Sequence, residues 1–142
     1  MQVREIMSQG VEVVSHDALL KEAALKMKTL DVGLMPVCDG SKLQGILTDR
    51  DITIRATAEG HDPLKTKVSE IMSKDVAYCF EDQDIDEAMK IMEARQIRRL
   101  PILNREKRLV GIVSLGDIAL HAPKKEAGET LKEISEPRTA PR

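Results

Sequence analysis

The chain contains the same pattern twice, and this internal repeat limits its fold more than any other feature of the sequence. The hexapeptide VREIMS at residues 3–8 returns as VSEIMS at residues 68–73. The same shift, lengthened by one inserted residue in the second half, matches Val11 with Val76, Asp17 with Asp82, Met27 with Met92, Pro36 with Pro101, Gly45 with Gly111 and Asp51 with Asp117. Chance does not maintain a register this long, so we expect two copies of one structural unit.

Each copy begins with an apolar strand and an amphipathic helix. The expected strands are 11–14 and 76–79, both short apolar runs. An acidic stretch follows, in which Asp17 of the first copy and Asp82 or Asp84 of the second can cap a helix. Apolar residues then recur at the spacing of one buried helix face, as Leu20, Ala23, Ala24 and Met27 and again as Ile85, Ala88, Met89 and Met92.

A hairpin and a second helix complete each copy. The expected hairpin strands are 34–37 with 42–47, and 99–103 with 108–113. Thr48 and Ser114 are good N-caps for the closing helices, the first of which should end near Gly60. Each copy thus reads β-α-β-β-α, and the fold class is α/β (α+β). A unit this small buries too little surface to be stable alone, so the two copies should pack against each other.

The repeat also sets the expected domain boundaries. These are repeat one at 1–60, a linker at 61–67, repeat two at 68–122 and a charged C-terminal tail at 123–142. The tail is rich in Lys, Glu, Pro and Thr, with a short helix expected at 126–134 and a frayed end.

The composition argues against two classes of partner. The chain has one Tyr, one Phe, no Trp and a net charge of −2, so it lacks both the stacking side chains and the positive charge of a nucleic-acid binder. No apolar run approaches the ~20 residues of a membrane span, and the start MQVREIMSQG lacks the apolar core of a signal peptide. We expect a cytoplasmic protein that binds neither nucleic acid nor membrane.

The sequence carries no constellation typical of an enzyme. His16, His61 and His121 are isolated and fit no metal-ligand spacing. Nucleophile motifs, GxGxxG and the P-loop are absent. Cys38 and Cys79 each lie in an apolar stretch, which predicts buried, inert thiols, although a redox disulfide stays open. We therefore expect a protein that is not an enzyme, has no metal site and requires no cofactor.

Three features together resemble a known family. They are the doubled V-x-E-I-M-S, the strand ending in Pro36 or Pro101, and a turn of the form G-h-h-[ST]-x-x-D at 45–51 and 111–117. The chain resembles two CBS domains in tandem, an arrangement called a Bateman module. The segments TDRDI, DVGLMP and QIRRLPIL are most similar to small stand-alone two-CBS proteins of bacteria and archaea.

The resemblance implies a regulatory, ligand-sensing role. In this family, two repeats pack with pseudo-twofold symmetry around two clefts, and the clefts often bind adenosine-containing ligands such as AMP, ADP, ATP or S-adenosylmethionine. Two such pairs commonly join as a disc-shaped homodimer. An adenosine nucleotide is therefore the expected regulatory ligand, and the effector protein is unknown.

The chemistry of the closing turn fits that expectation. Asp51 and Asp117 lie three residues after the cap, where a carboxylate can accept from both ribose hydroxyls. The hydroxyls of Thr48 and Ser114 and the free N–H groups beside them can meet a phosphate. The alternative is that these residues serve only as N-caps and favour the helix dipole.

The two copies differ in positive charge. The second copy has Arg98 and Arg99 where the first has Gly33 and Leu34, and in nucleotide-binding relatives a basic pair at this strand start reaches the phosphates. Because side chains alternate along a strand, only one of the two should face the cleft. A solvated basic edge is the alternative. We expect the site with Ser114 to be the tighter one.

Further candidates come from the resemblance alone. Val11, Val76, Tyr78 and Pro101 would border the adenine, and Tyr78 could either stack on the base or pack in the fold. The complete set of predicted ligand-binding residues is Thr48, Asp51, Ser114, Asp117, Arg98, Arg99, Val11, Val76, Tyr78 and Pro101.

Two other functions stay open, together with an expected assembly. The clefts could have lost ligand binding and the protein could serve as an interaction module, or the cysteines and histidines could form a metal or redox sensor. The closing helices carry apolar residues that we expect to be exposed and to form a homodimer interface, namely Ile52, Ile54, Ala56, Ile118 and Leu120.

Overall fold

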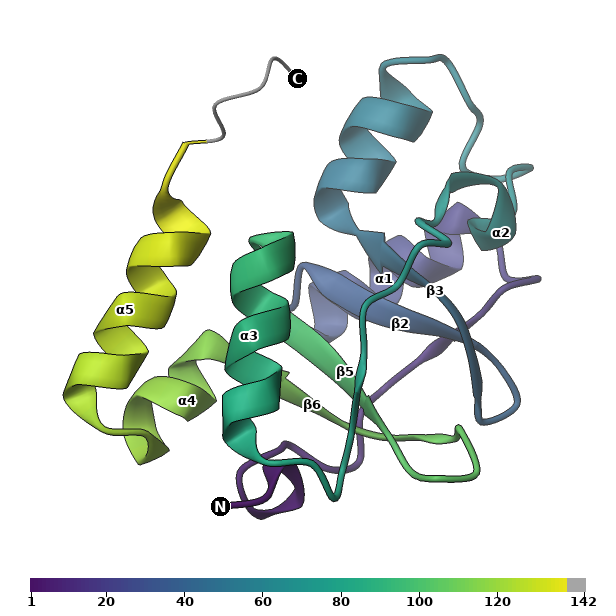
Figure 1. The fold of residues 1–142 in the computed structure, drawn as a ribbon. Helices are drawn as coiled ribbons and strands as arrows, with labels where there is room; N and C mark the ends of the chain where they lie inside the picture. The colour runs from purple at the N-terminus through teal and green to yellow at the C-terminus, as the bar shows by residue number, and fades with distance from the viewer. Residues whose placement is uncertain (138–142) are drawn as a thin grey trace. The chain divides into compact units, whose positions relative to one another are not determined.

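A three-stranded sheet forms the centre of each repeat in a computed structural model that describes residues 1–137 (Figure 1). One sheet has the order β1 (Val14–Ser15), β2 (Leu34–Asp39), β3 (Lys42–Thr48), and the other β4 (Cys79–Phe80), β5 (Arg99–Leu103), β6 (Leu109–Ser114). In both, the first strand is parallel to the second, and the second and third form an antiparallel hairpin. The expected α/β fold of two matched repeats is confirmed.

The chain divides into two compact units that differ from the sequence repeats. The middle unit is Glu12–Val76, and the split unit joins Met1–Val11 to the chain from Ala77 onward. Each unit has its own hydrophobic core. The fully buried side chains include Leu20, Val37 and Leu47 in the middle unit and Met92, Leu100 and Ile102 in the split unit.

The repeated hexapeptides explain this difference. The 3₁₀-helix η1 (Val3–Glu5) lies in the split unit, where Val3 is fully buried in the core. The matching helix α2 (Val68–Ile71) lies in the middle unit, with Val68 fully buried. Each hexapeptide therefore completes the core beneath the hairpin of the other repeat.

Backbone pairing fixes the end of each hexapeptide. The Ser8 N–H donates to the Ile112 carbonyl at 2.8 Å, and the Ile112 N–H donates back to the Ser8 carbonyl at 3.1 Å. Ser73 and Ile46 form the matching pair at 2.8 and 2.9 Å. The hexapeptide thus adds a bridge to the outer edge of the last strand in its unit.

This pairing explains why glycine occupies the same position in the two closing strands. A Cβ atom on Gly111 would lie 2.8 Å from the Ser8 carbonyl oxygen, and one on Gly45 would lie 2.7 Å from that of Ser73. Both distances are shorter than real Cβ contacts, and the obstacle is backbone. The G-h-h motif therefore carries glycine where it meets the hexapeptide.

The first strand of each repeat is shorter and later than the sequence predicts. The expected strands 11–14 and 76–79 are wrong in extent, because β1 begins at Val14 and β4 begins at Cys79. The candidate residues Val11 and Val76 consequently lie outside any strand.

Proline on the neighbouring strand accounts for the late start. Val14 lies opposite Val37, so the residue before Val14 would face Pro36. Ile46, the antiparallel partner of Pro36, directs its N–H away from β2, which leaves the backbone of Pro36 facing β1. Proline has no N–H to donate, so the ladder ends there. Pro101 limits the second sheet in the same way.

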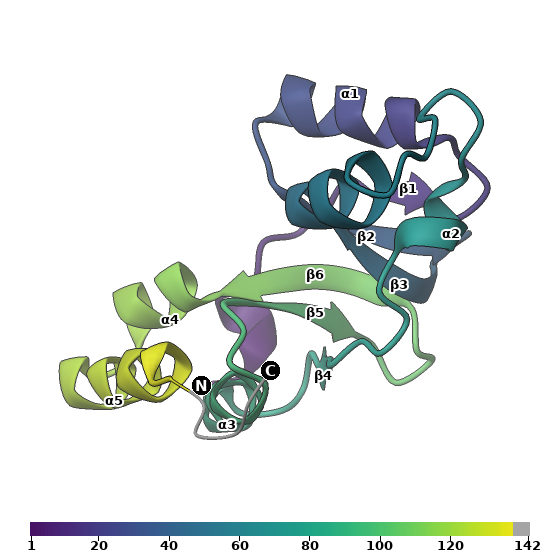
Figure 2. The same ribbon diagram turned by 90° about the horizontal axis from the view of Figure 1, so that it is seen from above.

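The first helix of each repeat buries the predicted face with one exception. These helices are α1 (Leu20–Leu30) and α3 (Ile85–Arg95), and every predicted position on them is buried except Ala24, which is exposed. The difference arises because α3 has a second neighbour, the C-terminal helix α5 (Lys124–Ser135), which lies beside it in Figure 1. In Figure 2, α1 lies along one face of its sheet.

The N-cap of the first helix agrees with the sequence in the second repeat only. Asp84 is the N-cap of α3 and accepts from the Asp86 N–H at 3.0 Å. Asp82 instead pairs with Arg105, with N–O distances of 2.8 and 2.9 Å. The expected cap Asp17 is wrong, since Leu19 occupies the N-cap position of α1.

The closing helices begin at the predicted residues. Ser114 caps α4 (Leu115–His121), and the helical stretch after Thr48 continues as a π-helix, η2 (Asp51–Thr57), before the positive φ of Gly60. Two of the residues expected on exposed faces are corrected: Ala56 and Ile118 are buried, because they face the core of their own unit.

The C-terminal tail contains a longer helix than expected. Instead of 126–134, α5 spans Lys124–Ser135 and buries Thr130 and Ile134. The Thr130 hydroxyl donates to Glu93 Oε1 at 2.8 Å, which ties α5 to α3. The expected frayed end at 138–142 lies outside the described residues.

The exchange of hexapeptides between the repeats can be tested at two matched positions, Val3 and Val68. Val3→Ala and Val68→Ala each remove two buried carbons, so each should lower the free energy of unfolding by about 2 kcal/mol. Hydrogen exchange should accelerate in α3 and β5 for Val3→Ala, and in α1 and β2 for Val68→Ala, because these elements share the respective cores. The reverse pattern would contradict the exchange.

Candidate functional site

The turn that closes the second repeat is held by reciprocal hydrogen bonds. The Asp117 N–H donates to Ser114 Oγ at 3.0 Å, and the Ser114 N–H donates to Asp117 Oδ2 at 2.8 Å. Thr48 and Asp51 form the same pair at 3.0 Å in both directions. One carboxylate oxygen of each aspartate is therefore engaged in a capping box, as the alternative interpretation of these residues requires. The other oxygen, Oδ1, has no protein partner within residues 1–137.

Strand register brings Arg99 next to this turn. Arg99 starts β5 and lies directly opposite Ser114 at the end of β6. The Leu115 N–H also donates to the Arg98 carbonyl at 2.8 Å. Both arginines are exposed, and neither side chain makes a hydrogen bond or ion pair with any other described residue. Two uncompensated cations thus flank the capped turn.

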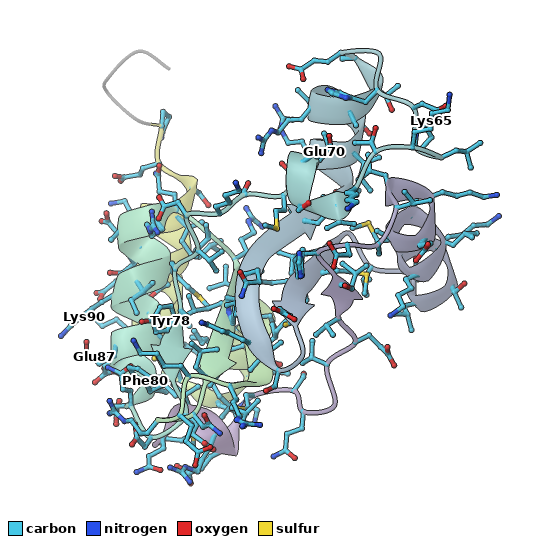
Figure 3. The ribbon with its side chains drawn as sticks, turned by 90° about the vertical axis from the view of Figure 1, so that its right-hand side faces the viewer. Lys65, Glu70, Tyr78, Phe80, Glu87 and Lys90 are labelled. Carbon is cyan, nitrogen blue, oxygen red and sulfur yellow. The ribbon has the colours of Figure 1, made fainter. Side chains whose placement is uncertain are left out.

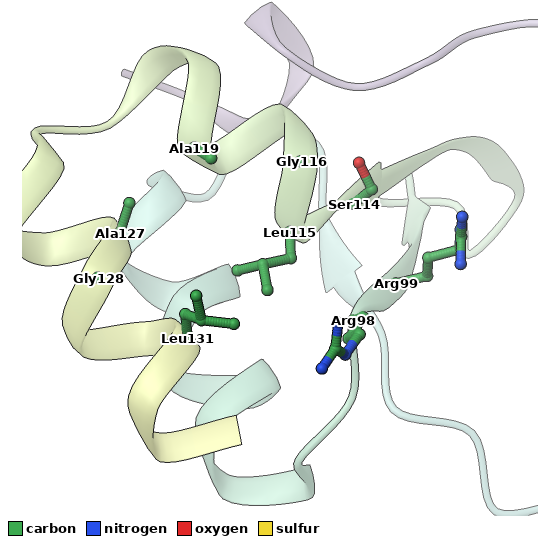
Figure 4. Close-up of a pocket in the computed structure, with 9 residues that line it drawn as sticks. All are labelled: Arg98, Arg99, Ser114, Leu115, Gly116, Ala119, Ala127, Gly128 and Leu131. Atoms are coloured by element: carbon green, nitrogen blue, oxygen red, sulfur yellow. The ribbon is translucent and has the colours of Figure 1, made fainter. Parts of the chain in front are cut away.

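A pocket of about 540 Å³ adjoins the arginines. It is lined by Arg98, Arg99, Ser114, Leu115, Gly116, Ala119, Ala127, Gly128 and Leu131 (Figure 4). In Figure 4 the guanidinium of Arg98 lies on the side of α5, whereas that of Arg99 lies on the far side of the strand start. This divergence agrees with the alternation expected along a strand.

The wall formed by α5 was not predicted as part of any site. Ala127, Leu131 and the buried Ile134 recur at helical spacing, which is the signal that could have revealed an apolar face in the charged tail. The C-terminal end of α5 is held through Gln96, whose Nε2 donates to the carbonyls of Glu133 and Glu136 at 3.2 and 2.7 Å.

The equivalent turn of the first repeat carries the opposite charge. Gly33 takes the place of Arg98, and a Cβ atom on it would lie 2.9 Å from Asp49 Oδ2. The Asp49 N–H donates to the Gly33 carbonyl at 2.9 Å, and Asp49 Oδ1 accepts from the Arg50 N–H at 2.8 Å. A carboxylate therefore lies beside the position that corresponds to Arg98, which disfavours an anionic ligand there.

The other predicted site residues do not line the pocket. Val11 and Val76 are half-buried, and Val76 belongs to the middle unit. Tyr78 is 37% exposed and meets the edge of Phe80 at a centroid distance of 5.6 Å (Figure 3). Pro101 is buried within β5. Tyr78 thus packs against a neighbouring ring, one of the two roles considered for it.

The thiols are buried, as predicted. Burial raises the pKa of the Cys79 thiol to about 11 and also raises the pKa of Cys38. Cys79 Sγ donates to Gln83 Oε1 at 3.2 Å. Within residues 1–137 no three His, Cys, Asp or Glu side chains are grouped so that they could hold a metal ion. Nor is any helix in that range long and apolar enough to cross a bilayer.

Comparison with known proteins finds one family. Residues 3–56 and 68–124 each match the CBS domain. The chain is 42% identical over 134 residues to CBS domain-containing protein YhcV of Bacillus subtilis, with 94% of each chain covered. It is 39% identical over 135 residues to Hypoxic response protein 1 of Mycobacterium tuberculosis, again with 94% of each covered.

Solved structures agree with the sequence matches. A crystal structure of Hypoxic Response Protein I with two coordinated zinc ions has a TM-score of 0.80 and 40% identity, covering 87% of this chain and 100% of that one. The CBS domain pair of protein MJ0100, in complex with 5′-methylthioadenosine and S-adenosyl-L-methionine, has a TM-score of 0.71 and 30% identity, covering 84% and 94%.

The raised thiol pKa values predict low reactivity in the native state. With a pKa of about 11 for Cys79, only about 1 thiol in 1,000 is ionised at about pH 8, and thiolate is the reactive form. Ellman's reagent should react slowly with the folded protein and rapidly with both cysteines in concentrated guanidinium chloride. Cys38→Ala assigns the residual signal to Cys79. Rapid modification of the folded protein would instead favour a redox role.

Proposed function

The chain belongs to the CBS domain family as a tandem pair, and from that premise we propose that it is a regulatory module that binds an adenosine-containing ligand at the closing turn of its second repeat. The observation that carries this proposal is the register of the β5–β6 hairpin. It sets Arg99 opposite Ser114, whose capping partner is Asp117. Within residues 1–137, neither the Arg99 side chain nor Asp117 Oδ1 has a protein partner. The bound methylthioadenosine and S-adenosylmethionine of the MJ0100 pair support the ligand class.

Each side chain has a distinct role in the proposal. Asp117 Oδ1 accepts from the ribose hydroxyls while Oδ2 keeps its bond to the turn, so the carboxylate is already oriented before a ligand arrives. Arg99, which lies opposite Ser114, attracts the phosphates through charge-assisted hydrogen bonds, which contribute about 1.5–3 kcal/mol each, and Arg98 adds positive charge nearby. Val11, Val76, Tyr78 and Pro101 remain candidates for the adenine contacts.

Charge selects the second repeat over the first. Asp51 can address a ribose as Asp117 does, but Asp49 lies over Gly33 in place of the arginine pair. A phosphate at Thr48 would therefore meet a like charge. We propose that AMP, ADP or ATP binds more tightly at the Ser114 turn than at the Thr48 turn.

Regulation requires that the ligand favour one arrangement of the protein over another. A ligand shifts a conformational equilibrium only by the difference between its affinities for the two states. Each alternative function has its own test. A wild-type protein that binds none of these ligands would favour the interaction module. Metal analysis of the purified protein would test the sensor role, given the zinc ions in Hypoxic Response Protein I.

The ligand assignment can be tested with matched variants. Asp117→Ala should weaken adenosine, AMP and ATP alike by about tenfold or more, because it removes a hydrogen bond to the shared ribose. The double variant Arg98→Gln with Arg99→Gln should weaken ATP and AMP far more than adenosine. Titration calorimetry measures both effects, and a ligand at 100 times its Kd should add about 2.7 kcal/mol to native stability.

Asp51→Ala is the matched control for that experiment. It breaks the same capping box in the first repeat, so it carries the same local cost of about 1 kcal/mol without touching the proposed site. Its affinity for ATP should stay close to that of the wild type. Loss of binding in Asp51→Ala with retention in Asp117→Ala would show that the site is assigned to the wrong repeat.

We also propose that the protein is a homodimer. Of the apolar residues predicted for the interface, Ile54 and Leu120 are exposed, at 50% and 81%. Light scattering should give the mass of a dimer at micromolar concentration, and Leu120→Glu should shift the protein toward monomer, because a charge on an apolar interface must be desolvated. A monomer mass for the wild type would contradict the proposal.

A further inference from the structure

We propose that the pocket between α4 and α5 is a second binding site, which takes a small ligand that combines an apolar body with an anionic group. The pocket adjoins the proposed adenosine site, because Arg98, Arg99 and Ser114 also line it. Asp117 does not line the pocket, and four of the lining residues, Ala119, Ala127, Gly128 and Leu131, lie beyond the ribose-binding turn. The proposal would hold even for a protein that binds no nucleotide.

The body of the pocket is apolar. Leu115 at the start of α4 and Leu131 on α5 point toward each other in Figure 4, with Ala119 and Ala127 further along the same two helices. Leu131 is 45% exposed, although Thr130 and Ile134 on the neighbouring face of α5 are buried against the split unit. Covering such apolar surface contributes about 25 cal/mol per Å². A ligand with an apolar body would gain this contribution.

Gly128 keeps the pocket open. Glycine inside a helix costs about 0.5–1 kcal/mol relative to alanine. At Gly128 the backbone is helical, and an added Cβ atom would meet no heavy atom within 4 Å. Neither backbone conformation nor close packing therefore requires glycine at this position. The absence of a side chain at this position leaves space next to Leu131.

The charges around the pocket favour an anion. Arg98 directs its guanidinium to the side of α5 and has no partner within residues 1–137. Lys124, one helical turn before Gly128, lies on the same side of α5 as that glycine. Glu126 and Glu133 fall on other sides of α5 by the same spacing. On the side of α5, an anionic group placed at Arg98 would thus meet cations rather than carboxylates.

The size of the pocket limits the ligand. A volume of about 540 Å³ is within the range of small-molecule sites, about 300–1,000 Å³. The lining offers one guanidinium on the side of α5 and otherwise mainly aliphatic side chains. A medium-chain carboxylate has the matching chemistry, because its chain contacts the leucines and its carboxylate pairs with Arg98.

Octanoate is a suitable probe, with 1-octanol as its uncharged counterpart. Titration calorimetry should detect octanoate binding to the wild type. Gly128→Leu should abolish binding because the new side chain fills the pocket, whereas Gly128→Ala should retain it within about threefold. Arg98→Gln should weaken octanoate at least about tenfold and leave 1-octanol nearly unchanged, because only the anion pairs with the guanidinium.

Two controls separate this site from folding defects and from the nucleotide site. Thermal unfolding of Gly128→Leu should match or exceed that of the wild type, since leucine is the better helix former. Arg50→Gln removes an exposed cation in the middle unit and should leave octanoate binding unchanged. Asp117→Ala should also bind octanoate normally, so a failure of ATP binding alone overturns only the adenosine proposal. A wild type that does not bind octanoate, or a folded Gly128→Leu that still binds it, overturns the inference made here.

Discussion

The backbone bridge between each hexapeptide and the last strand of the other repeat is the interaction on which the rest of the structure depends. Ser8 with Ile112 and Ser73 with Ile46 exchange both of their hydrogen bonds, which covers the outer edges of β6 and β3. The glycine beside each bridge leaves room for the approaching backbone. With that edge covered, the buried valine of each hexapeptide can enter the core between the sheet and its first helix.

The candidate site follows from the same strand. Because β6 is held on one edge by the hexapeptide and on the other by β5, its last residue, Ser114, is fixed opposite Arg99. The capping box then orients Asp117 from that fixed point. Charge distinguishes the two repeats at this turn, since the Asp49 carboxylate lies beside Gly33, which takes the place of Arg98. Two turns closed by the same reciprocal hydrogen bonds therefore differ in the charge beside them.

Much of this could be predicted from the sequence where the pattern is local. The β5 bounds, the Asp84 cap and the Ser114 cap follow from residue type and spacing. The late start of β1 depends on a proline in a different strand, and the exposure of Ala24 depends on which helix has a second neighbour. The pocket wall escaped prediction because the apolar spacing of α5 is diluted by lysines and glutamates. The first two of these failures concern contacts distant in sequence, whereas the third concerns a weak local pattern.

The exchanged hexapeptides also describe what a single repeat lacks. A fragment with one repeat would carry the apolar hexapeptide that packs in the other unit. Its own hairpin would present an uncovered strand edge and a gap in the core. Two such fragments could each place their hexapeptide in the core of the other, as in a domain-swapped dimer. A protein with one copy of this unit is therefore expected to exist as a pair, and duplication within one chain makes that pairing permanent and independent of concentration.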